Sequence, residues 1–343
     1  MTSDRLLGDL LAGRTAAVAR AISEVENGRP GFERLLAGVH PHVGRARRIG
    51  LTGPPGAGKS TLAERLVTAY RARGLTVAVV AVDPTSPFTG GALLGDRIRM
   101  ESVALDHGVF IRSMASRGSL GGLATTTREV CDLLDAAGFA RILVETVGVG
   151  QSELDVAGMA DSTLLVLVPE SGDGIQTLKS GVMEVADVFV VNKADRPGAE
   201  KLRQEIEVTL GIRRGNAYRH VPAHHGRTDG TRAPSPPAGS TGWEQPVLLA
   251  SAAKGEGTDA LIGALDRHHE WLAQSGQLAQ RRRRRLLERT REVVERATRR
   301  WLWDETPADR LVRERMDELA DGRLSPYELA TEILDGLRQS ERV

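Results

Sequence analysis

The stretch Gly53 to Thr61, GPPGAGKST, constrains this chain more than any other. It matches the pattern G-x-x-x-x-G-K-[S/T], in which glycines let successive backbone N–H groups point at phosphate oxygens. The apolar run Arg47 to Thr52 before it predicts a buried strand, and Leu62 to Gly74 after it has apolar residues at helical spacing. Strand, glycine loop and helix in this order form a phosphate-binding loop, or P-loop, at the partly positive start of a helix. The sequence therefore predicts a nucleotide-binding protein.

Each position of this loop has an expected role. Lys59 is expected to reach the β- and γ-phosphates as a catalytic residue, and the Ser60 hydroxyl is expected to ligate Mg²⁺. A glycine-rich turn that binds nothing is the alternative, and the Lys-Ser-Thr run with correct flanks on both sides disfavours it. The residues expected to contact nucleotide here are Gly53, Pro54, Pro55, Gly56, Ala57, Gly58, Lys59, Ser60 and Thr61.

Further apolar runs predict an α/β fold with a mostly parallel, doubly wound sheet whose strand ends carry acids. One run ends in Asp83, and a later one ends in Glu145 with Gly148 three residues beyond. Ligands of open α/β sheets bind at the carboxyl ends of the strands. We therefore expect Asp83 and Glu145 near Mg²⁺ and the Gly148 N–H near the γ-phosphate, all three as catalytic residues. Asp96 is a further candidate ligand for Mg²⁺, although a helix N-cap explains it equally well.

The segment VNKAD, which ends in Asp195, indicates which nucleotide base the protein binds. The Asp195 carboxylate can accept from N1–H and the exocyclic amine of guanine, whereas adenine would leave it unpaired. Asn192 is expected to tie this loop to the P-loop, and the Lys193 stem is expected to cover the base. A later strand ends in three residues whose backbone N–H groups could meet guanine O6. The residues expected to bind the base are Asn192, Lys193, Asp195, Ser251, Ala252 and Ala253, and together these motifs predict a GTPase.

Composition excludes several other classes. The 343 residues are 41% hydrophobic and 27% charged with a net charge of +1, which argues against general affinity for nucleic acid or acidic membranes. The single cysteine, Cys131, excludes an internal disulfide and a multi-cysteine zinc site, which favours a reducing compartment. No apolar run approaches the roughly 20 residues of a membrane span, and the first residues do not form a secretory signal. We expect a cytoplasmic protein without nucleic-acid or membrane partners.

The chain divides into an N-terminal helical segment, a nucleotide domain and a C-terminal helical arm. Leu287, Val294 and Trp301 mark one apolar stripe of a long helix in the arm. Such an arm needs a surface to pack on, and a second copy of the chain is the simplest, which predicts a homodimer. The expected bounds are 1–45, 46–275 and 276–343, with a mobile insertion at about 213–245.

With these motifs in place, the chain resembles the MeaB/ArgK family of methylmalonyl-CoA mutase-associated GTPases. The stretches that carry the resemblance are ARAISEVENG, GPPGAGKST, VDPTSPFTGGALLGDRIRM, RGSLGGLA, ETVGVGQSE, the segment from Gln176 to Lys179, VNKAD, and W-x-x-P-V before SA. They cover nearly the whole chain, and the insertion at Arg213 to Gln245 departs from the family.

The resemblance implies a Mg²⁺-dependent, homodimeric GTPase that binds GTP and GDP. It would act as a chaperone of an adenosylcobalamin-dependent acyl-CoA mutase, gating cofactor loading and protecting or reactivating that enzyme. Lys59 and Gly148 would read the phosphates. The implied Mg²⁺ contacts are Ser60, Asp83, Asp96 and Glu145.

Two features concern the switch and the attacking water. The segment with Gln176 and Lys179 lies between two predicted strands and is expected to carry the nucleotide state to a partner. Val149 follows Gly148 where a glutamine commonly orients water, so Asp83, Gln151, Glu153 or a partner are left as candidates and slow turnover is expected.

Other functions share this core. A nickel-insertion GTPase should show a Cys/His motif, which one cysteine supports poorly. A kinase or ATPase of a transport system, as in older ArgK-type descriptions, is disfavoured because no segment resembles a transporter subunit or a phosphate-accepting site. A pure scaffold would tolerate loss of Lys59, so measured GTP turnover separates it from an enzyme.

Overall fold

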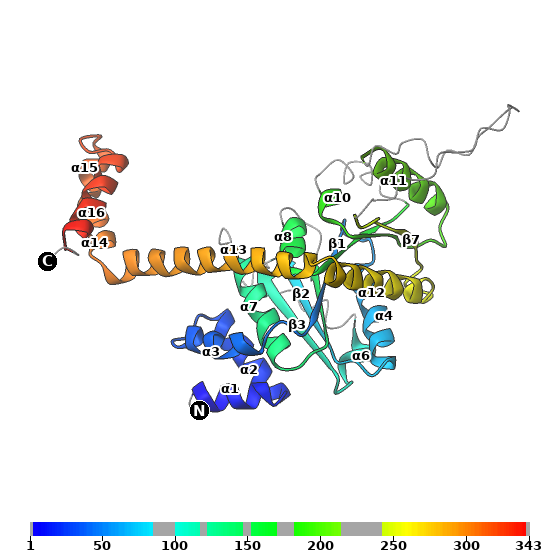
Figure 1. Ribbon diagram of the computed structural model, residues 1–343. Helices are drawn as coiled ribbons and strands as arrows, with labels where there is room; N and C mark the ends of the chain where they lie inside the picture. The colour runs from blue at the N-terminus through cyan, green and yellow to red at the C-terminus, as the bar shows by residue number, and fades with distance from the viewer. Residues whose placement is uncertain are drawn as a thin grey trace, which may run out of the picture. The chain divides into compact units, whose positions relative to one another are not determined.

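The computed structural model describes residues 3–84, 100–116, 122–146, 152–169, 182–213 and 242–340 (Figure 1). The chain forms two compact units, Met1–Arg282 and Arg283–Val343. The first contains a seven-stranded sheet in the order β3-β2-β4-β1-β5-β6-β7, and every pair of neighbouring strands is parallel. The strands are β1 (Arg47–Thr52), β2 (Val77–Pro84), β3 (Val109–Ser116), β4 (Arg141–Thr146), β5 (Ser162–Leu167), β6 (Val188–Val191) and β7 (Val247–Leu249). This is the doubly wound α/β sheet that the sequence predicts.

The strand order places the P-loop at a topological switch point of the sheet. Strands β2, β3 and β4 lie on one side of β1 and strands β5, β6 and β7 on the other. Crevices at such switch points, outside the carboxyl ends of the strands, are where open α/β sheets bind ligands. The segment that follows β1 is the P-loop, so the topology sets the phosphate-binding loop at the centre of that edge.

Helices cover both faces of the sheet because the strands are apolar on both sides. Along β2, Val77 and Val79 face one buried cluster while Ala78, Val80 and Val82 face the other. The helices of this unit are α1 (Ser3–Leu11), α2 (Thr15–Glu26), α3 (Phe32–Val39), η1 (His40–His42), α4 (Lys59–Ala72), α6 (Glu101–Ala104), α7 (Gly122–Ala136), α8 (Ser152–Met159), α10 (Val182–Val185), α11 (Ala199–Arg213) and α12 (Thr258–Gln274). Helix α13 (Gln277–Arg300) runs from this unit into the next.

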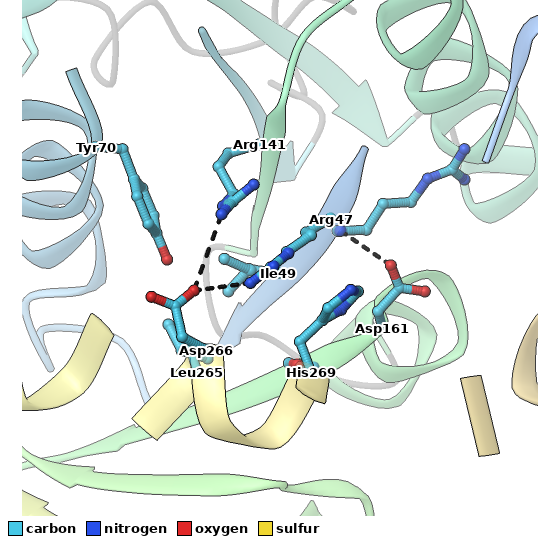
Figure 2. A pocket seen from close by; sticks show the side chains of 10 residues that line it. Arg47, Ile49, Tyr70, Arg141, Asp161, Leu265, Asp266 and His269 are labelled. Atoms are coloured by element: carbon cyan, nitrogen blue, oxygen red, sulfur yellow. Dashed lines mark hydrogen bonds and ion pairs between the residues drawn. The ribbon is translucent and has the colours of Figure 1, made fainter. Parts of the chain in front are cut away.

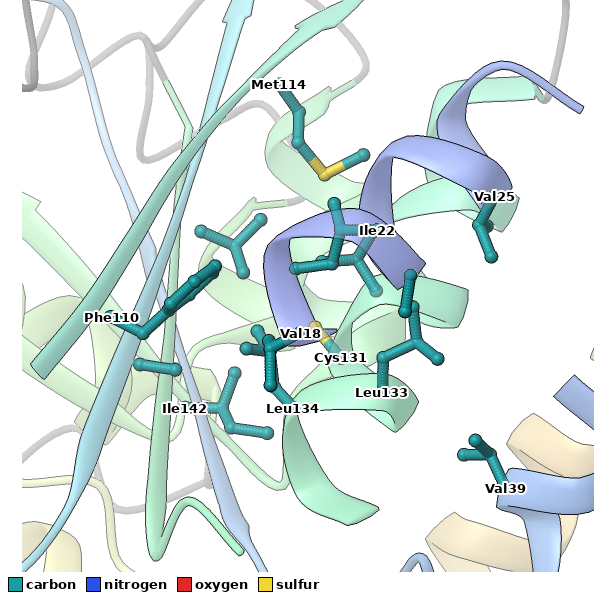
Figure 3. Packing of buried hydrophobic residues seen from close by; sticks show 14 of the residues in the cluster. Val18, Ile22, Val25, Val39, Phe110, Met114, Cys131, Leu133, Leu134 and Ile142 are labelled. Carbon is teal, nitrogen blue, oxygen red and sulfur yellow. The ribbon is translucent and has the colours of Figure 1, made fainter. Parts of the chain in front are cut away.

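The N-terminal helices are part of the core of the first unit. Val18 and Ile22 of α2 pack with Leu134 of α7 and Phe110 of β3 in one buried cluster (Figure 3). Cys131 lies in the same cluster and is fully buried, as a small apolar side chain would be. Helices α4, α6 and α12 cover the opposite face, and α10 and α11 cover strands β5 to β7.

The second unit has a small core of its own. Ala308, Leu324, Leu329 and Ile333 are buried together. Its elements are η2 (Trp301–Glu305), α14 (Ala308–Glu314), α15 (Met316–Ala320) and α16 (Pro326–Ser340). Among the described residues, no helix is both long enough and apolar enough to cross a bilayer.

Candidate nucleotide site

Two glycines shape the P-loop where no other residue fits. Gly58 precedes α4 with φ 85°, in the left-handed region that favours glycine. A Cβ at Gly58 would lie 2.5 Å from Nδ2 of Asn192, so the glycine also makes room for that side chain. Gly53 has φ 136°, and a Cβ there would lie 2.1 Å from the Val166 carbonyl oxygen of β5. The loop is thus packed between β5 and the VNKAD segment, and α4 begins directly at Lys59.

Lys59 is held across the mouth of this loop. Its side chain is buried, with 5% of the residue exposed. Nζ donates to the carbonyl oxygens of Gly53, at 2.7 Å, and Pro54, at 3.0 Å. The ammonium is therefore fixed over the amide-lined loop at the N-terminus of α4, where a phosphate would add a charge-assisted bond.

Ser60 and Glu145 meet although 85 residues separate them. The Ser60 hydroxyl donates to Oε1 of Glu145 at 2.6 Å, and Glu145 is 4% exposed. Strand pairing brings them together, because Leu51 of β1 is in register with Glu145 of β4. Asp83 lies at the end of β2, in register with Ala115 of β3, and its side chain is outside the described part. A buried carboxylate beside a hydroxyl on a phosphate-binding helix fits the oxygen ligands that Mg²⁺ takes, so these residues would hold it.

Asp195 is prepared as an anionic acceptor. The Ser251 hydroxyl donates to its Oδ1 at 2.9 Å, and Lys254 Nζ lies 3.8 Å from Oδ2. The hydrogen bond from Ser251 is the main reason that the pKa of Asp195 lies below its ordinary value, with Lys254 a smaller contribution. Lys193, two residues earlier, has φ 55°, a left-handed conformation uncommon for a lysine. An ionised carboxylate at this point suits the N1–H and amine of guanine.

Asn192 joins the base segment to the P-loop, as the sequence predicts. Its Nδ2 donates to the Ala57 carbonyl oxygen at 2.8 Å, and its Oδ1 accepts from the Ala252 N–H at 3.1 Å. This second bond changes the expectation for guanine O6. The Ser251 N–H donates to the Glu256 carbonyl oxygen and the Ala252 N–H to Asn192, so two of the three expected amide donors have acceptors within the protein.

Comparison with known proteins identifies the family to which this chain belongs. A family model described as "Methylmalonyl Co-A mutase-associated GTPase MeaB" matches residues 18–306. The chain belongs to the MeaB family of GTPases. As in that family, its activity is hydrolysis of GTP to GDP and phosphate.

Three similar proteins illustrate the range of the MeaB family likeness. A putative GTPase of Pyrococcus horikoshii is 44% identical over 291 residues, 85% of each chain. The "Methylmalonic aciduria type A homolog, mitochondrial" of Mus musculus is 34% identical over 296 residues, 81% of this chain and 66% of that protein. A crystal structure described as a LAO/AO transport system kinase superposes with a TM-score of 0.67 at 28% identity, covering 98% of both chains.

The geometry of this MeaB-family site includes Arg65, which sequence reasoning missed. Arg65 lies on α4, six residues after Lys59, and donates to two carbonyl oxygens of the turn from Ser251 to Ala253. An arginine on the polar side of an amphipathic helix carries no distinguishing signal in the sequence. Five of the predicted residues lie outside the described part of the chain: Asp96, Gly148, Gln151, Gln176 and Lys179.

A pocket lies at the opposite, amino edge of the sheet (Figure 2). Its empty volume is about 210 Å³, which includes open solvent at its mouth. Arg47 of β1 and Arg141 of β4 point toward Asp266 of α12, whose Oδ1 lies 2.8 Å from Arg47 NH1 and 3.9 Å from Arg141 NH2. The Arg141 guanidinium also lies over the Tyr70 ring, 5.3 Å from its centre. Burial is the main reason that the pKa of Tyr70 is raised to about 12. These contacts join the strands to the helices below the nucleotide site.

Proposed function

We propose that this GTPase is the chaperone of an adenosylcobalamin-dependent acyl-CoA mutase. In this role GTP hydrolysis gates cofactor loading and protects or reactivates the mutase. The observation that carries the proposal is the extent of the family match, residues 18–306, under a description that names methylmalonyl-CoA mutase. The match begins in α2 and ends beyond α13, so it is not a likeness of the P-loop core alone. The name of the mouse relative points in the same direction.

Hydrolysis in this proposal rests on charge placed against the phosphates. Lys59 offsets the charge that develops on the β- and γ-phosphate oxygens, and amide groups at the start of α4 hold the phosphates in line. Mg²⁺ held by Ser60, Glu145 and Asp83, with Asp96 as a further candidate, would neutralise further phosphate charge. Asp195 and the turn from Ser251 hold the base. Asp83, Gln151, Glu153 or a residue of the mutase completes the site by orienting water.

The proposed route to the mutase is the chain between β5 and α10. It carries Gln176 and Lys179 and follows a strand that packs against the P-loop. Together with the segments after Asp83 and Gly148, it would take different arrangements with GTP and GDP and so give the mutase different affinities for the two states.

GTP turnover with and without the cognate mutase tests the proposal. We expect the mutase to raise the rate of phosphate release, and we expect Lys179→Ala to keep the basal rate but lose part of the stimulation. Full stimulation of the Lys179→Ala variant would remove Lys179 from the coupling. Absence of both complex formation and stimulation would overturn the chaperone role while leaving the GTPase intact.

The proposed homodimer forms through the apolar stripe of α13. Leu287 and Val294 are 54% and 58% exposed, and their spacing of seven residues puts them on one face. Exposed apolar rows of this kind are covered by a second surface. The double variant Leu287→Glu with Val294→Glu should be monomeric by light scattering, with unchanged helix content. A variant that stays dimeric would move the interface elsewhere.

The likeness to a transport system kinase gives one competing function. A kinase transfers the γ-phosphate to a protein, whereas a chaperone GTPase releases it. GTP labelled on the γ-phosphate distinguishes the two functions in the mutase assay. Stable transfer of the label to any protein present would favour the kinase.

A further inference from the structure

Arg65 connects the phosphate-binding helix to the turn expected to bind the base. Its Nε donates to the Ala252 carbonyl oxygen at 2.8 Å, and its NH2 donates to the Ala253 carbonyl oxygen at 3.0 Å. The planar guanidinium presents its donors in a fixed fork, so two bonds to consecutive carbonyls set both the place and the orientation of the turn. We propose that Arg65 is a positioning residue for guanine selectivity, which aims the Ala253 N–H at guanine O6. This inference rests on the base site proposed above.

The geometry of the peptide unit carries the effect across the turn. The Ala252 carbonyl and the Ala253 N–H belong to one planar peptide, and no described peptide bond is cis. In a trans peptide the C=O and N–H point in opposite directions. A guanidinium that holds the Ala252 oxygen on one side therefore fixes the direction of the Ala253 N–H on the other.

The remaining amides of the turn have other acceptors. The Ser251 N–H donates to Glu256, the Ala252 N–H to Asn192 and the Lys254 N–H to the Ser251 carbonyl oxygen. Within the described part of the chain, the Ala253 N–H has no acceptor, which makes it the donor available for O6. A cation on the Ala252 carbonyl also polarises that peptide and strengthens its N–H as a donor.

Two side chains thus connect the turn to the phosphate-binding segments. Asn192 links Ala57 to the Ala252 N–H, and Arg65 links α4 to the carbonyls of Ala252 and Ala253. The phosphate-binding and base-binding segments are consequently held in one register, which a rigid nucleotide requires.

The experiment compares Arg65→Ala with Arg71→Ala by calorimetry at pH 7. Arg71 is a matched control, because it lies on the same helix and its guanidinium also contacts two groups away from the turn. These are the Asp106 carboxylate, at 2.9 Å, and the Leu75 carbonyl oxygen, at 2.8 Å. The ligands are GDP, IDP, which keeps O6 but lacks the 2-amino group, and 6-thio-GDP, whose sulfur is a poor acceptor.

We expect Arg65→Ala to weaken GDP and IDP by about tenfold, the loss of one hydrogen bond of ~1.4 kcal/mol, and 6-thio-GDP by much less. The preference for GDP over 6-thio-GDP should therefore collapse, while the preference for GDP over IDP, set by Asp195, should persist. Arg65→Lys should recover part of the selectivity, and Arg71→Ala should match the parent.

Two results would overturn the inference. Equal weakening of all three ligands by Arg65→Ala would mean that Arg65 supports the fold of α4 and not the O6 contact. An unchanged preference for GDP over 6-thio-GDP would mean that the turn needs no help from Arg65. A parent protein that fails to bind GDP would instead contradict the base site itself.

Discussion

At the carboxyl edge of the sheet, Lys59 donates to two backbone carbonyl oxygens, Ser60 donates to Glu145, and Asp195 accepts from Ser251. At the amino edge, Arg47 and Arg141 both contact the Asp266 carboxylate and so connect strands β1 and β4 to helix α12. Both edges combine buried charge with aligned strand ends. They differ in the backbone, because among the described residues the carboxyl edge has a glycine loop followed by the start of the 14-residue helix α4, whose N–H groups are suited to an anion.

A buried serine, histidine and aspartate near the amino edge make the same point. The Ser162 hydroxyl lies 2.8 Å from Nδ1 of His268, and Nε2 of His268 lies 3.3 Å from Oδ1 of Asp187. These residue types serve in nucleophilic catalysis elsewhere. Here His268 is fully buried and Asp187 also accepts from Arg281 and from the Thr163 N–H. Residue types do not make a reactive site without access for a substrate.

The largest expected effect is that of Lys59→Ala. Lys59 is proposed to face the β- and γ-phosphates, so loss of its charge should lower GTP turnover by at least about 100-fold. Arg47→Ala, which removes a cation of the opposite edge, should leave turnover within about threefold of the parent. Phosphate-release assays on both variants test the contrast. Comparable losses would mean that the two edges are energetically coupled.

The next effect concerns the base. Asp195→Asn removes the carboxylate that we propose accepts from guanine, so GTP affinity should fall by about 100-fold, in the range of two charge-assisted bonds. The amide can donate to the C2 carbonyl of xanthine, so the variant should prefer XTP. Competition binding with GTP, XTP and ATP measures this. Equal affinity of the parent for ATP and GTP would remove Asp195 as the base selector.

The fold and the principal motifs of this site could be predicted from sequence because they depend on local patterns. The GPPGAGKST loop, the acid at Glu145 and the VNKAD segment each follow an apolar run, and parallel strands bring their ends together. Contacts made by side chains across the fold could not be predicted. The bonds from Arg65 to the turn and from Ser251 to Asp195 depend on register between helix, strand and turn, which no spacing in the chain encodes.

The amino edge should show itself in the pH dependence of stability. Burial is the main reason that the pKa of His269 is lowered to about 4. The positive charges of Arg47, Arg282 and Arg141 also lower it, and the negative charge of Asp161 offsets part of this. The neutral ring therefore adds stability above the unfolded pKa of about 6.5, and this is lost as pH falls toward 4. A shift of this size is worth ~3 kcal/mol for a buried group, and partial exposure reduces it to about 2 kcal/mol.

His269→Gln, which does not titrate, should lose less stability than the parent between pH 7 and pH 4.5, by about 2 kcal/mol. Urea unfolding at the two pH values measures the difference, and carboxylates common to both proteins cancel in the comparison. GTP turnover at pH 7 should match the parent. Parallel losses of stability in the two proteins would show that His269 does not carry this acid sensitivity.

The smallest expected effect is that of Ser162→Ala. Burial alone would raise the pKa of Asp187, but the nearby His268 ring, 3.3 Å away, and the hydrogen bonds from Arg281 lower it, so the carboxylate stays ionised beside His268. Loss of the serine hydroxyl leaves Nδ1 of His268 without its partner and should cost about 1 kcal/mol of stability. GTP turnover should not change, and a fluorophosphonate probe should not label the folded parent. Labelling at Ser162 would show that the amino edge opens enough to react, and the contrast between the two edges would then be one of dynamics.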